Sequence, residues 1–209
     1  MCIYITMKWS LNDYTKSGFV KLLKPFESSI DDVIKATRAF GMATKAHKGQ
    51  FRDETRVEPY INHPLRVALI LTEELHKYDV DLVCAALLHD TIEKSGSKNN
   101  DNTVSEDHLK EFGESVYSIV HAVTKPKIRE AEREKLLDDY FQNIRKGSEA
   151  IRYVKIADQL DNIRSLRNSN HKDKVLRYKE ETQKYVVPIA QKTDEKLVFK
   201  LSLALYEVR

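Results

Sequence analysis

The adjacent residues His89 and Asp90 are the strongest sign of chemistry in the sequence. They follow an apolar run at positions 85–88 (AALL). Because a buried imidazole or carboxylate is costly without a partner, this apolar setting predicts that both side chains have one. A divalent cation best explains a His and an Asp side by side in such a place, since both side chains are metal ligands.

Two other segments could supply further ligands. His63 precedes Pro64, a residue that suits the first position of a helix, so His63 is the expected N-cap of that helix. Further along the chain, Asp158 and Asn162 are one helical turn apart and lie off the apolar stripe of their segment. That arrangement is typical of a helix that borders a polar cavity.

Together these side chains would make a site for one divalent cation. Two imidazoles and two carboxylates suit Mn²⁺, Fe²⁺ or Zn²⁺ and leave positions open for water and substrate. Glu93 lies four residues after His89, one turn along an expected helix over 79–94, where it could act as a base. The sequence thus indicates metal-activated water attacking a phosphoryl or similar group. The proposed ligands are His63, His89, Asp90 and Asp158.

Composition argues against several other classes of protein. The 35 basic and 32 acidic residues leave a net charge of only +3, which is no signature of nucleic-acid binding. No apolar stretch is long enough to span a bilayer. The two cysteines, Cys2 and Cys84, form no spacing motif, so we expect a cytoplasmic protein without a disulfide framework.

The sequence predicts an all-α fold, a compact single domain of about eight to ten helices. Glycine and proline are few, at 6 and 5 residues, and no strand-like alternation is evident. Residues 1–28 are expected to form an N-terminal extension or a short helix, and residues 29–209 the domain itself, with Ser29 as the first N-cap. The expected helices cover residues 29–47, 64–77, 79–94, 105–122, 129–146, 149–167, 173–191 and 194–208.

The order of the proposed ligands resembles the H…HD…D pattern of the HD-domain metal-dependent phosphohydrolases. Longer stretches are similar to the hydrolase domain of the Rel/SpoT alarmone family, and the resemblance covers about residues 30–192. It points to the small, single-domain alarmone hydrolases, including the metazoan type. The similar stretches are residues 46–52 (AHKGQFR), 58–64 (EPYINHP), 85–93 (AALLHDTIE) and 154–166 (VKIADQLDNIRSL).

The resemblance implies an enzyme that takes one Mn²⁺ per chain and removes the 3′-pyrophosphate from (p)ppGpp, a small nucleotide. Carried over to this chain, the metal ligands are the four residues proposed above. Glu93 would orient or deprotonate the attacking water. Arg52 would contact the purine, and Asn162 would contact the nucleotide.

Lys94 departs from that family, whose members usually have a second catalytic acid at this position. Three interpretations stay open. Lys94 could impair hydrolysis while metal and nucleotide still bind, it could bind a phosphate of another substrate, or it could pair with a neighbouring acid and leave Glu93 sufficient. The alternative functions are therefore a regulatory binding module and a phosphohydrolase of shifted specificity, such as an NADPH 2′-phosphatase. Asp53, where lysine is common in the family, argues against strict guanine-nucleotide specificity. Asp161 is expected to be a surface charge.

Overall fold

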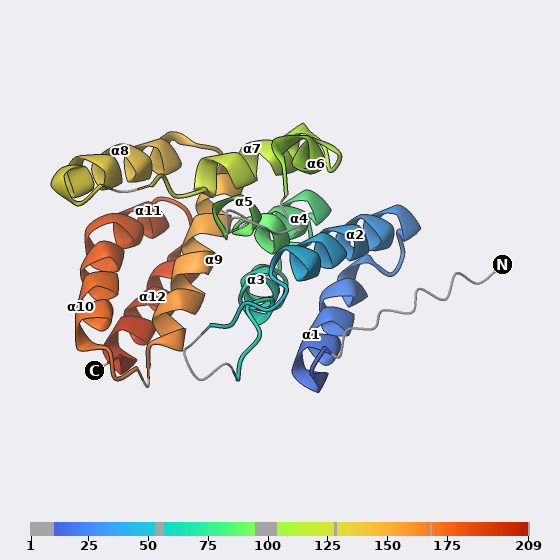
Figure 1. The fold of residues 1–209 in the computed structure, drawn as a ribbon, viewed down its shortest axis with the longest axis horizontal. Helices are drawn as coiled ribbons and strands as arrows, with labels where there is room; N and C mark the ends of the chain where they lie inside the picture. The colour runs from blue at the N-terminus through green and yellow to red at the C-terminus, as the bar shows by residue number, and fades with distance from the viewer. Residues whose placement is uncertain (1–10, 53–56, 95–103, 128, 168, 209) are drawn as a thin grey trace.

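The computed structural model describes residues 11–52, 57–94, 104–127, 129–167 and 169–208, apart from the side chains of Glu93 and Lys94. Within these ranges the chain is helical, and an isolated antiparallel bridge joins Phe51 to Pro59. The expected all-α fold is therefore confirmed (Figure 1).

Most of the expected helices are present, and several are divided. The first half of the chain forms α1 (Asp13–Leu23), η1 (Lys24–Phe26), α2 (Ile30–Ala46), α3 (Asn62–Leu69), the π-helical turn η2 (Ile70–Glu74), α4 (Val80–Leu88) and α5 (Thr91–Lys94). The second half forms α6 (Glu106–Lys110), α7 (Glu114–Val123), η3 (Glu130–Glu132), α8 (Arg133–Lys146), α9 (Glu149–Ser165), α10 (Lys172–Glu181), the π-helical turn η4 (Thr182–Val186), α11 (Val187–Gln191) and α12 (Glu195–Glu207).

Polar N-caps explain where several helices begin. Ser29 caps α2, as the sequence predicts, because its Oγ accepts a hydrogen bond from the backbone N–H of Asp32. Asp79 caps α4, and Ser148 caps α9 in the same way. Each side chain replaces a hydrogen-bond partner that the first turn of a helix lacks.

The prediction that His63 is an N-cap is wrong. Helix α3 begins at Asn62, with Ile61 in the N-cap position, so His63 lies within the first turn. The reason is that the turn before it is already helical. Ile61 has φ −55° and ψ −23°, and the backbone N–H of His63 donates to the carbonyl of Tyr60 at 2.9 Å. The His63 side chain is therefore free of a capping role and points into the interior.

The prediction of one helix over 79–94 is also wrong. Helix α4 ends at Leu88 and α5 begins at Thr91, so His89 and Asp90 lie in a turn between them. The hydroxyl of Thr91 donates to the carbonyl of Leu88 at 2.7 Å. Such side-chain bonds compete with the helical ladder and occur where it is interrupted. The break places both side chains between α3 and α9 instead of along one helix face.

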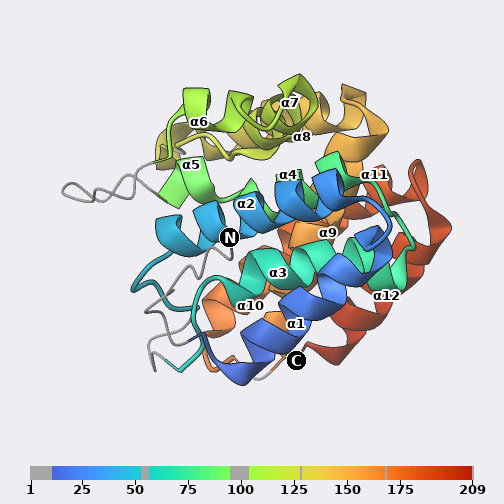
Figure 2. The same ribbon diagram turned by 90° about the vertical axis from the view of Figure 1, so that its right-hand side faces the viewer.

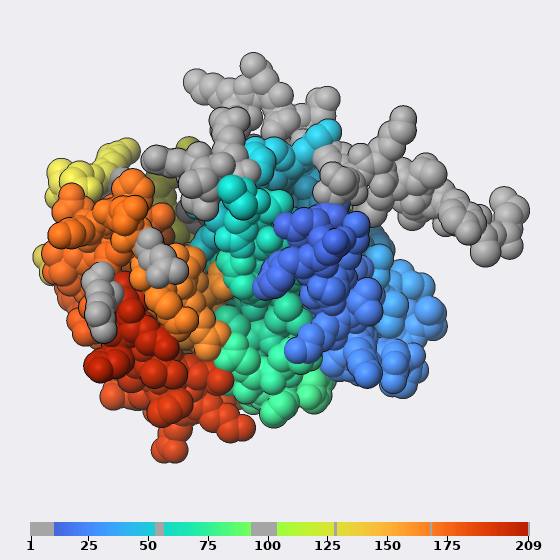
Figure 3. Space-filling view, turned by 90° about the horizontal axis from the view of Figure 1, so that it is seen from below, coloured from blue at the N-terminus to red at the C-terminus, as the bar shows by residue number. Residues whose placement is uncertain are grey.

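Helix α9 runs through the middle of the molecule. Figure 1 shows α10, α11 and α12 on one side of it and α3, α4, α2 and α1 on the other, with α7 and α8 across one end. The view turned by 90° places α3 and α4 in front of α9 (Figure 2). From below, α3 and α9 separate α12 from α1 (Figure 3). Because α9 contacts neighbours on nearly every side, even its polar residues 155, 158, 159 and 161 are buried.

The first helices share the core of the domain. Leu22 of α1 and Phe26 of η1 are buried in the same hydrophobic cluster as the later helices. The domain boundary after residue 28 stays a prediction. None of the helices in the described part of the chain is long and apolar enough to cross a membrane.

Candidate metal centre and nucleotide cavity

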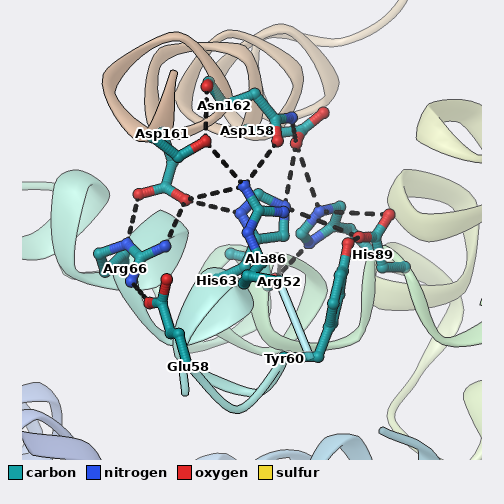
Figure 4. Close-up of polar contacts among 12 residues, drawn as sticks. Arg52, Glu58, Tyr60, His63, Arg66, Ala86, His89, Asp158, Asp161 and Asn162 are labelled. Atoms are coloured by element: carbon teal, nitrogen blue, oxygen red, sulfur yellow. Dashed lines mark hydrogen bonds and ion pairs between the residues drawn. The ribbon is translucent and has the colours of Figure 1, made fainter. Parts of the chain in front are cut away.

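The structure brings the four proposed ligands together from three separate elements. Figure 4 shows three of them, His63, His89 and Asp158, beside one another. His63 comes from α3, His89 and Asp90 from the turn after α4, and Asp158 from α9. Asp158 Oδ1 lies 3.2 Å from His63 Nε2 and 3.6 Å from His89 Nε2. The carboxylate of Asp90 lies 3.6 Å from His63 Nε2 and 3.5 Å from His89 Nε2. All four residues are buried.

The hydrogen bonds of the two imidazoles fit a metal at the centre of this cluster. His63 Nδ1 is bonded to Asp161 Oδ2 at 2.7 Å, and His89 Nδ1 to the carbonyl of Ala86 at 2.7 Å. Within the described residues the buried Nε2 of each ring makes no hydrogen bond. Donor atoms of His63, His89 and Asp90 lie within 4.8 Å of one another. Two unpaired nitrogens facing carboxylates are the donor set that a divalent cation requires.

The ionisable groups of the cluster alter one another's pKa. Burial by itself would lower the pKa of His89, but the carboxylates of Asp90 and Asp158 outweigh it and raise that pKa to about 9. Burial would raise the pKa of Asp158, yet the Lys155 ammonium and the two imidazoles hold it well below its usual range. Lys155 Nζ donates to Asp158 Oδ2 at 2.8 Å, from the side away from the imidazoles. Asp158 is therefore ionised, and its Oδ1 is the oxygen that faces the two imidazoles.

Tyr60 contributes to the cluster although sequence reasoning assigned it no role. Its hydroxyl donates to Asp90 Oδ2, and its ring packs against His47 and the edge of His63, at 4.8 and 5.7 Å between ring centres. Tyr60 lies in the stretch 58–64, which resembles the alarmone hydrolases, and that resemblance could have pointed to a role for it. Tyr60 thereby orients the Asp90 carboxylate.

Arg52 and Asn162, the two expected substrate contacts, lie beside each other and beside the proposed ligands. Arg52 Nη2 donates to Asn162 Oδ1 at 3.0 Å, and Asn162 Nδ2 donates to Asp158 Oδ1 at 2.6 Å. The Arg52 guanidinium also lies over the Tyr60 ring, 5.4 Å from its centre. A backbone hydrogen bond from Arg52 N–H to the Glu58 carbonyl, at 3.0 Å, joins the segment that follows α2 to the segment that precedes α3.

A cavity of about 1260 Å³ opens above the cluster. Asp90 and Asp158 lie in its lining together with Arg52, Tyr60 and Asn162. The volume is larger than the roughly 300–1,000 Å³ of ordinary small-molecule sites, which suits a nucleotide with several phosphates. Further basic side chains line the cavity, together with the acidic side chains of Glu58, Asp173 and Glu181. The basic residues are Lys125, Lys155, His171, Lys172 and Lys174.

The side chains of Glu93 and Lys94 lie outside the described residues, as does Asp53. Helix α5 begins at Thr91, directly after Asp90, so Glu93 and Lys94 belong to the helix that follows the cluster. Their expected roles stay predictions.

The prediction that Asp161 is a surface charge is wrong. Its side chain is only 4% exposed, since α9 is covered on nearly every side. Burial would raise the pKa of Asp161, but His63 and the Arg66 guanidinium lower it to about 2. The available signals were its position three residues after Asp158 and a basic residue three positions after His63. Neither spacing identifies a contact between α3 and α9 without the fold.

Comparisons with known proteins identify the family of the chain. The profile described as HD domain matches residues 39–194. The guanosine-3′,5′-bis(diphosphate) 3′-pyrophosphohydrolase MESH1 of Xenopus tropicalis is 37% identical over 137 residues, which are 65% of this chain and 72% of that protein. Its human counterpart is 38% identical over 129 residues, 61% of this chain and 67% of that protein.

Longer relatives and a solved structure extend the comparison. A guanosine-3′,5′-bis(diphosphate) 3′-pyrophosphohydrolase of Haemophilus influenzae is 39% identical over 156 residues, and the match covers 72% of this chain but 21% of that protein. A structure described as a metazoan ortholog of SpoT that hydrolyses ppGpp superimposes with a TM-score of 0.68 and 29% identity, covering 83% of this chain and 94% of the other. The chain therefore belongs to the HD-domain family and is a metal-dependent phosphohydrolase of the MESH1/SpoT-like group.

Proposed function

We propose that this protein hydrolyses guanosine 3′,5′-bis(diphosphate), or a closely related nucleotide, at its 3′-pyrophosphate. One water is consumed, and the products are GDP and pyrophosphate. The observation that carries the proposal is the convergence of two histidines and two aspartates at the base of a cavity lined by basic side chains. Relatives that match most of the chain are named for this reaction.

The metal would be held by four side chains of this chain, and we propose Mn²⁺, with Fe²⁺ or Zn²⁺ as alternatives. The ligands would be His63, His89, Asp90 and Asp158. When bound, such a cation lowers the pKa of water and neutralises charge on the phosphate. The protein contributes rings whose Nδ1 atoms are already bonded and a carboxylate, Asp158, that is already ionised.

Arg52 and Asn162 would bind the nucleotide above the metal. Arg52 lies with its guanidinium against the Tyr60 ring, and a planar guanidinium can stack on a purine in the same way. Asn162 has its amide nitrogen on Asp158 and its oxygen on Arg52, so it links the base-contacting arginine to the metal cluster. Lys172 and Lys174, which line the cavity from α10, would balance phosphate charge.

Glu93 would accept a proton from the attacking water, because it belongs to α5, the helix that begins directly after the ligand pair His89-Asp90. Lys94 replaces the second acid expected there, and a protonated lysine cannot accept a proton. We therefore propose a hydrolase that depends on Glu93 alone, with a non-catalytic binding module or a phosphohydrolase of shifted specificity as the alternatives.

The proposal is tested by incubating the Mn²⁺-loaded protein with ppGpp, pppGpp, ppApp and NADPH and identifying the products. We expect GDP and pyrophosphate from ppGpp, and loss of both bound metal and turnover in His89→Ala. His121→Ala, on the exposed face of α7, is the matched control and should retain both.

Other outcomes separate the alternatives. Release of phosphate from NADPH without ppGpp turnover would indicate shifted specificity. A folded, metal-loaded protein that binds ppGpp but turns over none of the four nucleotides would be a binding module. Wild-type protein without metal after Mn²⁺ incubation would contradict the metal site itself.

A further inference from the structure

The two imidazoles of the cluster are supported by different groups. His89 Nδ1 is bonded to a neutral acceptor, the carbonyl of Ala86, at 2.7 Å. His63 Nδ1 is bonded to a carboxylate, that of Asp161, at 2.7 Å. A carboxylate behind a metal-binding histidine fixes the ring's tautomer and increases its basicity as a ligand. The hydrogen-bond acceptor at His63 Nδ1 is therefore stronger than the acceptor at His89 Nδ1.

Asp161 is itself held in place by Arg66. Arg66 Nε donates to Asp161 Oδ1 at 2.6 Å, and Arg66 Nη2 donates to Asp161 Oδ2 at 3.1 Å, so the ion pair is bidentate. The other end of the guanidinium is hydrogen-bonded to Glu58 (Figure 4). Arg66 and Asp161 come from α3 and α9, the same two helices that supply His63 and Asp158.

The orientation of this network determines which nitrogen of His63 carries the proton. An ionised carboxylate can only accept, so Asp161 requires a proton on His63 Nδ1. The lone pair then lies on Nε2, which faces Asp158 Oδ1 at 3.2 Å and Asp90 Oδ2 at 3.6 Å. This is the only neutral tautomer of His63 that can bind a cation between those carboxylates.

We propose that Asp161 is a positioning residue, held by Arg66, that keeps His63 in the Nδ1–H tautomer and thereby sets the affinity of the cluster for its metal ion. Its effect on affinity rests on the proposed metal site. Its effect on the His63 ring does not, because the contacts among Asp161, Arg66 and His63 exist without a metal.

The substitution Asp161→Asn tests this sharply because Arg66 offers only donors. An asparagine has a single amide oxygen. If that oxygen faces Arg66 Nε, at 2.6 Å, the amide NH₂ faces His63 Nδ1, which then accepts, and a proton on His63 Nε2 can be donated to Asp158; only Arg66 Nη2 loses its acceptor. If the oxygen faces His63 and Arg66 Nη2 instead, Arg66 Nε meets the amide NH₂, and the lone pair of His63 Nε2 faces two carboxylates. The first arrangement pairs more groups in the metal-free protein, so we expect the proton to move to His63 Nε2 and the lone pair no longer to face the metal position.

Glu74→Gln is the matched control. Glu74 accepts two hydrogen bonds from the Arg164 guanidinium, at 2.7 and 3.0 Å. Arg164 lies in α9, three residues after Asp161. It contacts none of the four proposed ligands. A general effect of losing an arginine–carboxylate pair would appear equally in both variants.

The experiment combines two measurements. One is ring ¹⁵N NMR of the metal-free protein at a pH high enough for the His63 ring to be neutral, and the other is a Mn²⁺ titration monitored by electron paramagnetic resonance. His63→Gln identifies the His63 signals by their loss. We expect the Nδ1–H tautomer of His63 in the wild type and in Glu74→Gln. In Asp161→Asn we expect the Nε2–H tautomer and Mn²⁺ affinity about 10- to 100-fold weaker.

Several results would overturn the inference. A wild-type His63 in the Nε2–H tautomer would do so without any variant. Wild-type tautomer and affinity in Asp161→Asn, or an equal loss of affinity in Glu74→Gln, would do so as well. If the wild type binds no Mn²⁺, the proposed metal site and the effect on affinity both fail, while the tautomer still decides whether Asp161 positions the ring.

Discussion

Replacing Lys155 by methionine should destabilise the metal-free protein about twice as much as the metal-loaded one. The Lys155 side chain is only 7% exposed, and its Nζ lies 2.8 Å from Asp158 Oδ2. Its ammonium also lies 5.6 Å from the ring centre of Tyr140 and 5.9 Å from that of Phe141. Methionine keeps the length and the contact with both rings, so Lys155→Met removes mainly the charge.

The expected loss follows from the burial of the pair. Removing one partner of a buried ion pair costs roughly 3–5 kcal/mol, because the other charge is left uncompensated. Asn162 and the two imidazoles also face Asp158, so we expect the lower end, about 3 kcal/mol. For a chain of 209 residues, each kcal/mol shifts Tm by about 2–4 °C, and the metal-free variant should melt roughly 6–12 °C lower.

A bound cation would replace the charge that the variant lacks. Lys155 and a cation compete for the same Asp158 carboxylate, so the variant should bind Mn²⁺ more tightly than the wild type. A tenfold gain in affinity would add about 1.4 kcal/mol to the stabilisation by saturating metal. The Tm difference between variant and wild type should therefore shrink when Mn²⁺ is added.

The assay is thermal unfolding of both proteins with a chelator and with saturating Mn²⁺. Lys125→Met is the control, because Lys125 pairs with Glu181 at 2.8 Å in the same cavity and does not contact Asp158. Its Tm loss should not depend on metal. If Lys155→Met loses the same Tm with and without Mn²⁺, the argument that lysine and cation share one carboxylate is refuted.

Three further predictions concern substrate binding, acid stability and the altered acid pair. Arg52→Lys should raise KM about 10-fold or more, with a smaller change in kcat, because lysine lacks the planar guanidinium that stacks and makes bidentate contacts. Steady-state kinetics measures both constants, and an unchanged KM would show that Arg52 does not bind the nucleotide. Burial opposes ionisation of Glu74, but Arg164 and Lys200 lower its pKa below the ordinary 4.5. The ionised Glu74 therefore stabilises the folded protein above that pH, and this contribution is lost as the pH falls through the lowered pKa. Urea unfolding from pH 7 to 3 should therefore show a shallower acid loss in Glu74→Gln than in the wild type, and parallel curves would contradict this. Lys94→Asp should raise ppGpp turnover, and an unchanged rate in a variant that still binds ppGpp would show that Lys94 is not the obstacle.

The sequence was sufficient for the helical fold and for the four proposed ligands. Ser29 caps α2 where a local rule predicted it, because an N-cap depends only on neighbouring residues. The spacing of His63, the His89-Asp90 pair and Asp158 was readable because the order of ligands along the chain is a property of the sequence. That order predicted the cluster that α3, the turn after α4, and α9 form in space.

The tertiary structure alone decided how the cluster is supported. Asp161 has the local pattern of a surface charge, yet it is buried and bonded to Arg66, 95 residues away along the chain. No helical periodicity reveals that contact, because it depends on how α3 lies against α9. The break between Leu88 and Thr91 is similar, since an apolar run predicts a continuous helix. Patterns along a chain report which residues can be buried, whereas the packing of distant helices decides which buried charges meet and what each one holds in place.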